Sequence, residues 1–381
     1  MKLFQCQCCG HILYFENTVC LKCGSMLGYL PEDDRMIAVA PDGPIWRALP
    51  GAHGVAVGAS DPGPLRFCRN WERSACNWMH RSAAGDGTGK AGYCLACQHN
   101  RTVPDLSTPN HVALWIKIEA AKRRLVYSIL RLNLPRPLPE SGHAEPLVFD
   151  FLADDPASPK PVLTGHSDGV VTIALIEADD AAREERRSQM GEAYRTLLGH
   201  FRHEVGHYYW DILVRDNPAA LQACRTLFGD ERADYAEAMQ QHYLTGAPEG
   251  WENQFVSAYA TMHPWEDWAE TWAHYLHMVD TLETAAALGL RVDAGSALAA
   301  HVESDPYGSQ SAAELIGTWV PLTLALNSLN RSMGQNDLYP FSLSADVQAK
   351  LSFVHDLVRP CLRRAEGRQA QETEPKEVSP V

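Results

Sequence analysis

Residues 199–210 read GHFRHEVGHYYW and contain two histidines four positions apart, with a glutamate directly after the first. Residues at this spacing lie on one face of an α-helix, so His203 and His207 could both direct a ring nitrogen at one metal ion about 2 Å away. Glu204 lies about 100° further around the helix, where its carboxylate could reach a water on that ion. The pattern indicates a hydrolytic zinc site. Because so short a pattern also arises by chance, in which case both histidines are ordinary packed residues, a third ligand is required to support it.

The same helix carries a separate apolar face. We expect one helix over about residues 178–216, which packs through this face and leaves the histidines to a cleft. The apolar face consists of Leu198, Phe201, Val205, Tyr208 and Ile212.

The third ligand is expected in the segment HPWEDWAETWAHYLH, residues 263–277. A metzincin would have glycine at 210 and histidine at 213, but this chain has Trp210 and Leu213 there, which excludes that class. An alternative arrangement takes a glutamate from a second helix, and Glu266 and Glu270 lie four residues apart on one helical face. We predict that Glu266 is the ligand and that Glu270 orients a ligand histidine through its other ring nitrogen. The reverse assignment stays open.

Other residues near Glu266 have weaker signals. Asp267 is expected to be a first-turn charge stabilised by the helix dipole. His274 and His277 are expected to be packing or surface residues. Tyr259, seven positions before Glu266, could line the same cleft and donate a hydrogen bond to an oxyanion, with an ordinary packing role as the alternative.

These residues together predict peptide-bond hydrolysis. A bound zinc ion lowers the pKa of its water to about 7 and polarises the scissile carbonyl. Glu204 would take the proton of that water and pass it to the leaving amine. The run VVTIAL, residues 170–175, is a candidate edge strand that pairs with an extended peptide substrate, in which case proline at Thr172 should weaken peptide binding.

A rival catalytic motif lies just before that run. The segment TGHSDG has Gly165, Ser167 and Gly169 at the spacing of a serine-hydrolase elbow. The elbow requires a strand before the serine and a helix after it. Here a β-like run follows and SDG is typical of a turn, so a serine nucleophile is disfavoured.

Nine of the eleven cysteines lie within the first 97 residues. No apolar leader and no stretch long enough to span a membrane is visible, so we expect a cytoplasmic protein that does not act at a membrane, in which cysteine clusters bind metal rather than form disulfides. Cys224 and Cys361 stand alone in apolar helical contexts and are expected to be buried or half-buried thiols.

The first cysteine cluster has the pattern of a zinc ribbon. The segments CQCCG and CLKCG each supply two cysteines followed by glycine, which lets the backbone turn toward the sulfurs. Cys8 is the surplus thiol. The predicted ligands of this closed structural zinc site are Cys6, Cys9, Cys20 and Cys23.

The second cluster combines one loosely spaced pair with one CxxC pair. It predicts a second structural zinc, although His80 or His99 could replace one ligand, and a metal-free cluster of buried thiols is the alternative. Its members are Cys68, Cys76, Cys94 and Cys97.

Composition limits the possible partners. The net charge of −14 argues against a nucleic-acid surface over the whole chain, and 45% hydrophobic content in 381 residues is sufficient for two or three domains. The second half of the cysteine-rich region is locally basic. A solvated charged face is the favoured interpretation, with recruitment of a protein partner as an alternative and of nucleic acid as a less favoured one. The basic residues are Arg66, Arg69, Arg73, Arg81, Lys90 and Arg101.

With these motifs, the chain resembles a bacterial family of zinc-binding metallopeptidases that carry an N-terminal zinc-ribbon region. The resemblance extends to about residue 290 and is most specific in RTLLGHFRHEVGHYYW, TGHSDG, FGDERADYAEA and HPWEDWAETWAHYLH. It implies a zincin-like domain of the gluzincin type, with His203, His207 and Glu266 as ligands of one catalytic zinc and Glu204 as base. The spacing of Tyr259 and Glu266 is similar to that in some gluzincin toxins, where the tyrosine assists the transition state.

We therefore predict a mainly α protein with a small β-sheet. The predicted domains are a zinc-ribbon region over residues 1–105, a zincin-like metallopeptidase domain over 106–365, and a disordered tail over 366–381. The sheet is expected from LVFDFL and VVTIAL, and helices from residue 110 onward and at about 178–216, 230–244, 264–288, 310–331 and 343–365. The substrate is a peptide or protein. The alternative is a zinc-ribbon adaptor that binds a protein or nucleic acid and whose helical metal site is not catalytic.

Overall fold

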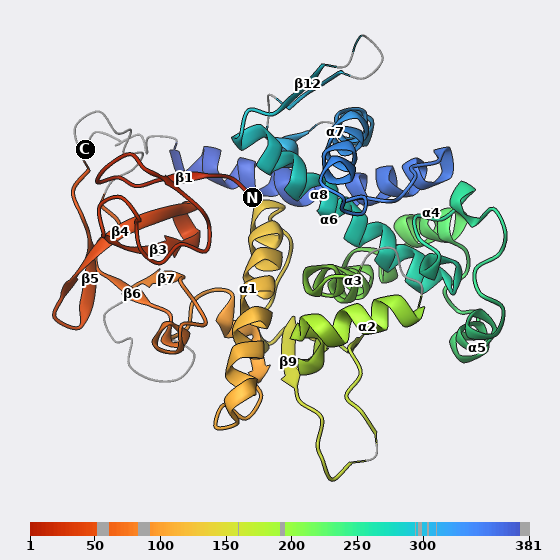
Figure 1. The fold of residues 1–381 in the computed structure, drawn as a ribbon, viewed down its shortest axis with the longest axis horizontal. Coiled ribbons are helices and arrows are strands. Elements are labelled where there is room, and N and C mark those ends of the chain that lie inside the picture. Colours follow the sequence, from red (N-terminus) through yellow and green to blue (C-terminus); the bar gives the residue numbers. More distant parts are fainter. Residues whose placement is uncertain are drawn as a thin grey trace, which may run out of the picture. The chain divides into compact units, whose positions relative to one another are not determined.

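The structure is a computed structural model, and the chain forms two compact units. Residues 1–127, 137–208 and 283–290 make the first unit, and residues 128–136, 209–282 and 291–381 make the second. Figure 1 shows the elements in chain order. The residues that the structure describes are 1–51, 61–82, 92–158, 160–190, 195–293, 295, 299–302, 305–309 and 311–373.

The cysteine-rich part of the first unit contains a five-stranded antiparallel sheet that the sequence analysis did not predict. Residues 36–39 are all buried, so the strand through them lacks the alternation by which a half-exposed strand is recognised. A β-carbon on Gly28 would lie 2.4 Å from the Met79 side chain, so the close approach of two strands requires glycine there. The sheet consists of β3 (Met26–Leu30), β4 (Arg35–Asp42), β5 (Ile45–Ala48), β6 (Leu65–Phe67) and β7 (Met79–Arg81), and β1 (Phe4–Gln5) pairs separately with β2 (Ile12–Leu13).

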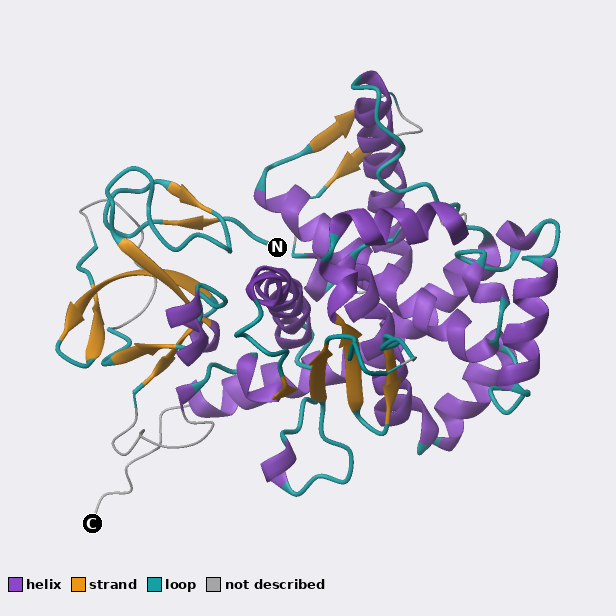
Figure 2. Cartoon of the chain, turned by 60° about the horizontal axis from the view of Figure 1, so that its bottom comes forward, coloured by secondary structure: helices purple, strands orange, loops and turns teal. Residues whose placement is uncertain are grey.

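A second sheet in the first unit contains the two predicted β-runs, and Figure 2 shows its strands in orange. Its order is β10-β11-β9-β8, with β11, β9 and β8 parallel and β10 antiparallel to β11. The strands are β8 (Asn100–Thr102), β9 (Val148–Leu152), β10 (Gly165–Ser167) and β11 (Val170–Ala174).

The prediction that VVTIAL is an edge strand is wrong. Thr172 pairs with Gly165 on one side and with Asp150 on the other, so β11 is an interior strand. Among the described strands, β10 and β8 are the two edges of this sheet. Proline at Thr172 would therefore break the sheet itself.

The segment TGHSDG forms a hairpin rather than a nucleophile elbow. Asp168 and Gly169 join β10 to β11 with φ of 50° and 79°, the left-handed conformations that a tight two-residue hairpin turn requires. A β-carbon on Gly169 would also lie 2.4 Å from the Pro146 carbonyl oxygen. Because a strand and not a helix follows Ser167, the turn interpretation is confirmed.

The helices agree with the predicted periodicity in most places. The predicted single helix over 178–216 is wrong, because residues 195–196 are not helical and the last turn, η7 (Asp211–Arg215), is a π-helix. The helix over Pro218–Phe228 was missed although Asn217 caps it, accepting from the Ala220 N–H. The helices are α1 (Pro109–Arg131), α2 (Asp180–Met190), α3 (Leu197–Trp210), α4 (Pro218–Phe228), α5 (Tyr235–Thr245), α6 (Pro264–Ala287), α7 (Ala312–Ser332) and α8 (Ala345–Thr373).

The second unit also contains a short antiparallel pair, β12 (Arg291–Asp293) and β13 (Ala299–His301). The last helix, α8, continues to Thr373, into the segment expected to be a disordered tail, because its glutamine, alanine, arginine and glutamate residues favour helix even without an apolar face. Residues 374–381 lie outside the described part of the chain. No helix among the described residues is long and apolar enough to cross a membrane.

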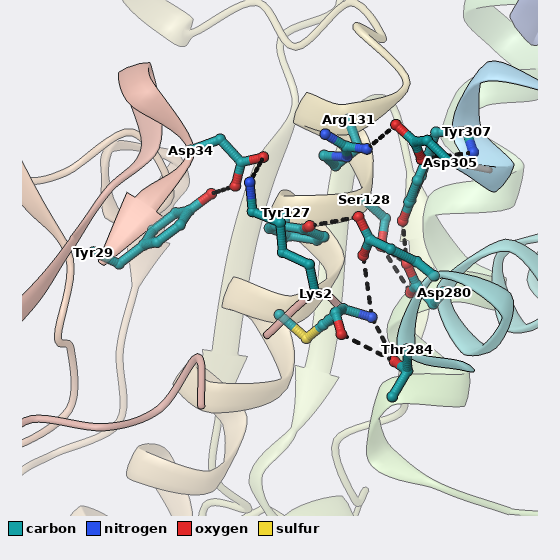
Figure 3. A network of polar contacts seen from close by, with 12 residues as sticks. Lys2, Tyr29, Asp34, Tyr127, Ser128, Arg131, Asp280, Thr284, Asp305 and Tyr307 are labelled. Carbon is teal, nitrogen blue, oxygen red and sulfur yellow. Dashed lines mark hydrogen bonds and ion pairs between the residues drawn. The ribbon is translucent and has the colours of Figure 1, made fainter. Parts of the chain in front are cut away.

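Buried carboxylates on α6 are held by hydrogen bonds, as Figure 3 shows. In the first unit, the Tyr127 hydroxyl donates to Glu283 at 2.7 Å. In the second unit, the Ser128 hydroxyl donates to Asp280 at 2.8 Å and the Tyr307 hydroxyl donates to the same carboxylate. The N-terminal ammonium of Met1 also lies 3.1 Å from Glu283. Hydroxyl donors and this ammonium therefore satisfy the two acids, and a metal is not needed to explain their burial.

Asp267 lies in the first turn of α6, as predicted, and also has a charged partner that the sequence did not indicate. It is fully buried, and its carboxylate lies 2.6 Å from the Lys350 ammonium of α8. Burial raises the pKa of Asp267 to about 7, against the opposing effect of Lys350. A residue 83 positions away thus compensates the charge, in addition to its place in the first turn of the helix.

We expect Lys350→Met to lower the free energy of unfolding by about 3 kcal/mol, because it leaves Asp267 as an uncompensated buried carboxylate. The folded state would then hold a proton that the unfolded carboxyl, with a pKa of about 3.9, releases. The loss should therefore grow as the pH rises from about 5 to about 8. Urea denaturation at both pH values measures it. The control is Lys350→Met with Asp267→Asn, which should recover much of the stability, and a single variant within about 0.5 kcal/mol of the parent would contradict the prediction.

Candidate metal centres

The first cysteine cluster forms as predicted. The sulfurs of Cys6 and Cys23 lie 3.7 Å apart and those of Cys9 and Cys20 lie 3.6 Å apart. A tetrahedron with Zn–S distances of about 2.3 Å has S–S edges of about 3.8 Å, whereas a disulfide would require about 2 Å. The four thiols therefore fit a tetrahedral zinc ion.

Glycine makes the backbone turn after each pair of this cluster. Gly10 and Gly24 have φ of 71° and 74°, and their N–H groups donate to the Cys6 and Cys20 carbonyls at 2.8 Å. Cys8 lies outside the group of four, as its surplus position predicted. The Ser25 hydroxyl and N–H lower the pKa of Cys23 to about 6, which favours the thiolate that binds metal.

The second cluster also brings its four cysteines together, and all four are buried. The sulfurs of Cys76 and Cys94 lie 3.7 Å apart, again close to the edge of a zinc–thiolate tetrahedron. His80 and His99 are not members of the group, and the Nδ1 atom of His99 lies 2.9 Å from the Leu147 carbonyl oxygen instead. Four cysteines and no histidine are thus the ligand set that the structure supports.

Helix α1 places two buried cations beside the second cluster. The Lys122 ammonium is fully buried, 2.7 Å from Glu119 and 3.7 Å from the Cys97 sulfur, and Arg123 is 6% exposed. Burial lowers the pKa of Lys122, but the Cys97 thiolate and Glu119 outweigh it and raise the pKa above its ordinary value. Four thiolates around a zinc dication carry a formal charge of about −2, and the buried Glu119 adds a further negative charge, so the two cations offset part of this charge. No sequence signal distinguished them from other helical basic residues.

The His-Glu-x-x-His motif lies on α3, most of which is buried. The rings of His203 and His207 have centroids 4.9 Å apart, and His207 and Glu204 are 4% and 7% exposed. The predicted apolar face is buried at Phe201. The two imidazoles and the Glu204 carboxylate on this helix are thus largely shielded from solvent.

Glu266 lies in the first turn of α6 and is buried. The Tyr235 hydroxyl, at the start of α5, donates to its Oε1 atom at 3.0 Å. Tyr235 was not predicted as part of a site, although it belongs to the FGDERADYAEA segment on which the family resemblance rests. The hydrogen bond from Tyr235 orients one oxygen of the Glu266 carboxylate. In this orientation the carboxylate can still bind a metal ion.

A third group of ligand atoms joins His203 and His207 to Glu266. One nitrogen from each imidazole and one carboxylate oxygen lie within 4.8 Å of one another, a spacing that a single ion can bridge. Two nitrogens and one oxygen are the donor set of a catalytic zinc that keeps a further position for water. Glu270 is not a member of this group.

Glu270 and Tyr259 have other contacts within the second unit. Glu270 accepts a hydrogen bond from the Ser257 hydroxyl at 2.6 Å. Tyr259 begins a short 3-10 helix, η9 (Tyr259–Thr261), and burial raises the pKa of its hydroxyl, with Glu266 as the next cause. The hydroxyl therefore keeps its proton at neutral pH and can donate it in a hydrogen bond.

His166 was not assigned a role from the sequence. It lies on β10, its ring centroid is 6.4 Å from that of His207, and its Nε2 atom accepts from the Gly169 N–H at 3.2 Å. Burial lowers the pKa of His166 to about 4, and His207 contributes in the same direction. A neutral imidazole therefore lines the hairpin beside the motif.

The remaining predicted residues have structural roles. His274 packs against Phe341 with ring centroids 4.5 Å apart, and neither it nor His277 belongs to a metal group among the described residues. Cys224 and Cys361 are buried as expected, and burial raises the pKa of Cys224 to about 12. Lys90, one of the predicted basic residues, lies outside the described part of the chain.

Comparisons with known proteins match this chain to two family models and to several relatives. A family model described as "Putative zinc-binding metallo-peptidase" matches residues 111–357, and a zinc-ribbon domain model matches residues 3–108. Uncharacterized proteins of Mycobacterium bovis and Mycobacterium tuberculosis are 40% identical over 358 residues, which cover 94% of this chain and 95% of theirs. No solved structure matches.

Proposed function

The chain belongs to the family of zinc-binding metallo-peptidases, and we propose that it hydrolyses peptide bonds at one zinc ion held by His203, His207 and Glu266. The observation that carries the proposal is the grouping of these three side chains within 4.8 Å. Glu266 belongs to this group and Glu270 does not, which supports Glu266 as the ligand and Glu270 as a positioning residue. The two four-cysteine clusters are structural, because four thiolates leave no position for a substrate.

Each of the chain's own residues has a distinct task in this proposal. A bound zinc ion supplies a polarised water and a Lewis acid for the scissile carbonyl. Glu204 follows the first ligand directly and is nearly buried, so its carboxylate takes the proton of the attacking water and delivers it to the leaving amine. Tyr259 keeps its proton at neutral pH and donates a hydrogen bond to the developing oxyanion.

The exposed edge of β10 is the proposed binding strand for the substrate. Among the described strands, β10 has a neighbour on one side only, and its residue His166 lies next to His207. An extended peptide can pair with such an edge through backbone hydrogen bonds. This assignment replaces β11, which is paired on both sides.

Metal removal tests the proposed function. We expect the full chain to lose hydrolysis of a quenched fluorescent peptide library by more than about 10²-fold when a chelator removes about one zinc per chain, because that ion has only three protein ligands. Added zinc should restore the activity. Zinc content, by mass spectrometry, and cleavage rate are measured on the same samples. The His207→Ala variant serves as the reference, because it should lack the zinc ion that the chelator removes.

Two results would contradict the proposal. One is a cleavage rate that persists after the labile zinc has gone. The other is inactivation by a serine-directed phosphonate together with a cleavage rate that chelators do not change. This result would favour Ser167 as a nucleophile.

A further inference from the structure

A cavity of about 420 Å³ lies beside the second cysteine cluster and includes Cys97 in its lining. It is formed within the first compact unit and uses none of the residues proposed for peptide hydrolysis. Its charged lining residues are Arg69, Arg73, Arg101 and Glu72, so positive charge predominates.

Two of the arginines have no charged partner. Arg69 and Arg73 are exposed and come from one 3-10 helix, η2 (Arg69–Arg73), that directly follows the zinc-ligand candidate Cys68. Within the described residues neither guanidinium makes an ion pair or a hydrogen bond. Arg101, by contrast, donates to the Asp150 carboxylate at 3.0 Å. The cavity therefore contains two guanidinium groups whose donors and charge are unused.

Trp115 supplies an independent observation. Its side chain is 1% exposed and lines the cavity, and its indole Nε1–H has no acceptor among the described residues. A buried indole N–H is normally hydrogen-bonded, and leaving it without an acceptor costs about 1–3 kcal/mol. A ligand oxygen that reached Nε1 from the cavity would satisfy this donor.

We propose that the cavity binds the phosphate group of a small phosphomonoester. Guanidinium groups match oxyanions through paired N–H donors, and the indole adds a third donor of the same polarity. Two guanidinium groups without a charged partner match the two negative charges of a phosphate better than the one charge of a carboxylate. Tyr93 and Leu106 also line the cavity and offer a less polar wall for the organic part of the ligand.

Calorimetric titration of the full chain at constant ionic strength tests the site with three probes: inorganic phosphate, adenosine monophosphate and acetate. We expect saturable binding of both phosphate probes and weaker binding of acetate. The double variant Arg69→Gln with Arg73→Gln should weaken phosphate binding at least about tenfold, and Trp115→Phe, which removes only the N–H donor, about fivefold. Unchanged thermal unfolding shows that the variants fold.

The matched control is Arg47→Gln with Arg81→Gln. It removes the same charge from the same region, but these arginines pair with Asp42 and Asp33 and do not line the cavity. We expect the control to bind phosphate within about twofold of the parent. Equal losses in the two double variants, acetate binding as tight as phosphate, or no saturable binding of either phosphate probe would overturn the proposal. Tighter binding of adenosine monophosphate than of inorganic phosphate supports a phosphomonoester as the ligand. Equal affinity for the two probes would overturn the phosphomonoester and indicate free phosphate instead.

Discussion

The Glu204→Gln variant is expected to hydrolyse peptides about 10³-fold more slowly than the parent while it keeps its zinc and its fold. Glutamine has nearly the shape of glutamate, so the packing of a side chain that is only 7% exposed is preserved. The amide cannot accept the proton of the attacking water, so the loss should appear in kcat and leave KM nearly unchanged. Cleavage of a quenched fluorescent peptide and zinc analysis of the same protein measure the two quantities.

The control for this variant is Glu184→Gln on α2. Glu184 is 62% exposed and pairs with Arg187 one turn away, so its replacement should not change the rate. A Glu204→Gln protein that retains full activity would exclude Glu204 as the base. If the parent itself cleaves no peptide while both proteins bind a partner equally, the adaptor interpretation would take the place of the peptidase.

Cys94→Ser is expected to remove one zinc ion and to unfold the region around the second cluster. Structural zinc contributes on the order of 10 kcal/mol to the folding of small zinc domains, which is comparable with the whole stability of an ordinary domain. The loss is aggravated here because Lys122 and Arg123 would remain buried without the thiolate charge that compensates them. Zinc analysis and limited proteolysis of the N-terminal region measure both effects.

Cys8→Ser is the matched control, since the surplus thiol lies outside both clusters. It should retain all zinc and the parent's resistance to protease. A Cys94→Ser protein with unchanged zinc content would show that the second cluster is a group of packed thiols without metal.

The predictions that succeeded rest on short-range spacing. The choice of Cys9 over Cys8 followed from the glycine after each pair, and Gly10 indeed turns with a positive φ. Such patterns are visible in a sequence because one helix or one turn fixes the distances.

The features that were missed depend on contacts between distant residues. Lys350 compensates Asp267 across 83 positions, and nothing near Asp267 in the sequence indicates a partner. The five-stranded sheet was not predicted because residues 36–39 of one strand are all buried. This strand therefore lacks the alternation of apolar and polar residues by which a half-exposed strand is recognised. The edge position of β10 follows from strand order, which a single sequence does not contain.

The π-helical turn at Asp211–Arg215 has a consequence for how the length of this segment can vary. A π-turn holds one more residue than an α-turn of the same helix, so it is equivalent to a single insertion. One residue could therefore be deleted between 211 and 215 and the turn would revert to regular α geometry. The spacing of His203, Glu204 and His207 lies upstream and would be unaffected, so we expect this turn to tolerate a one-residue deletion without disturbing the motif.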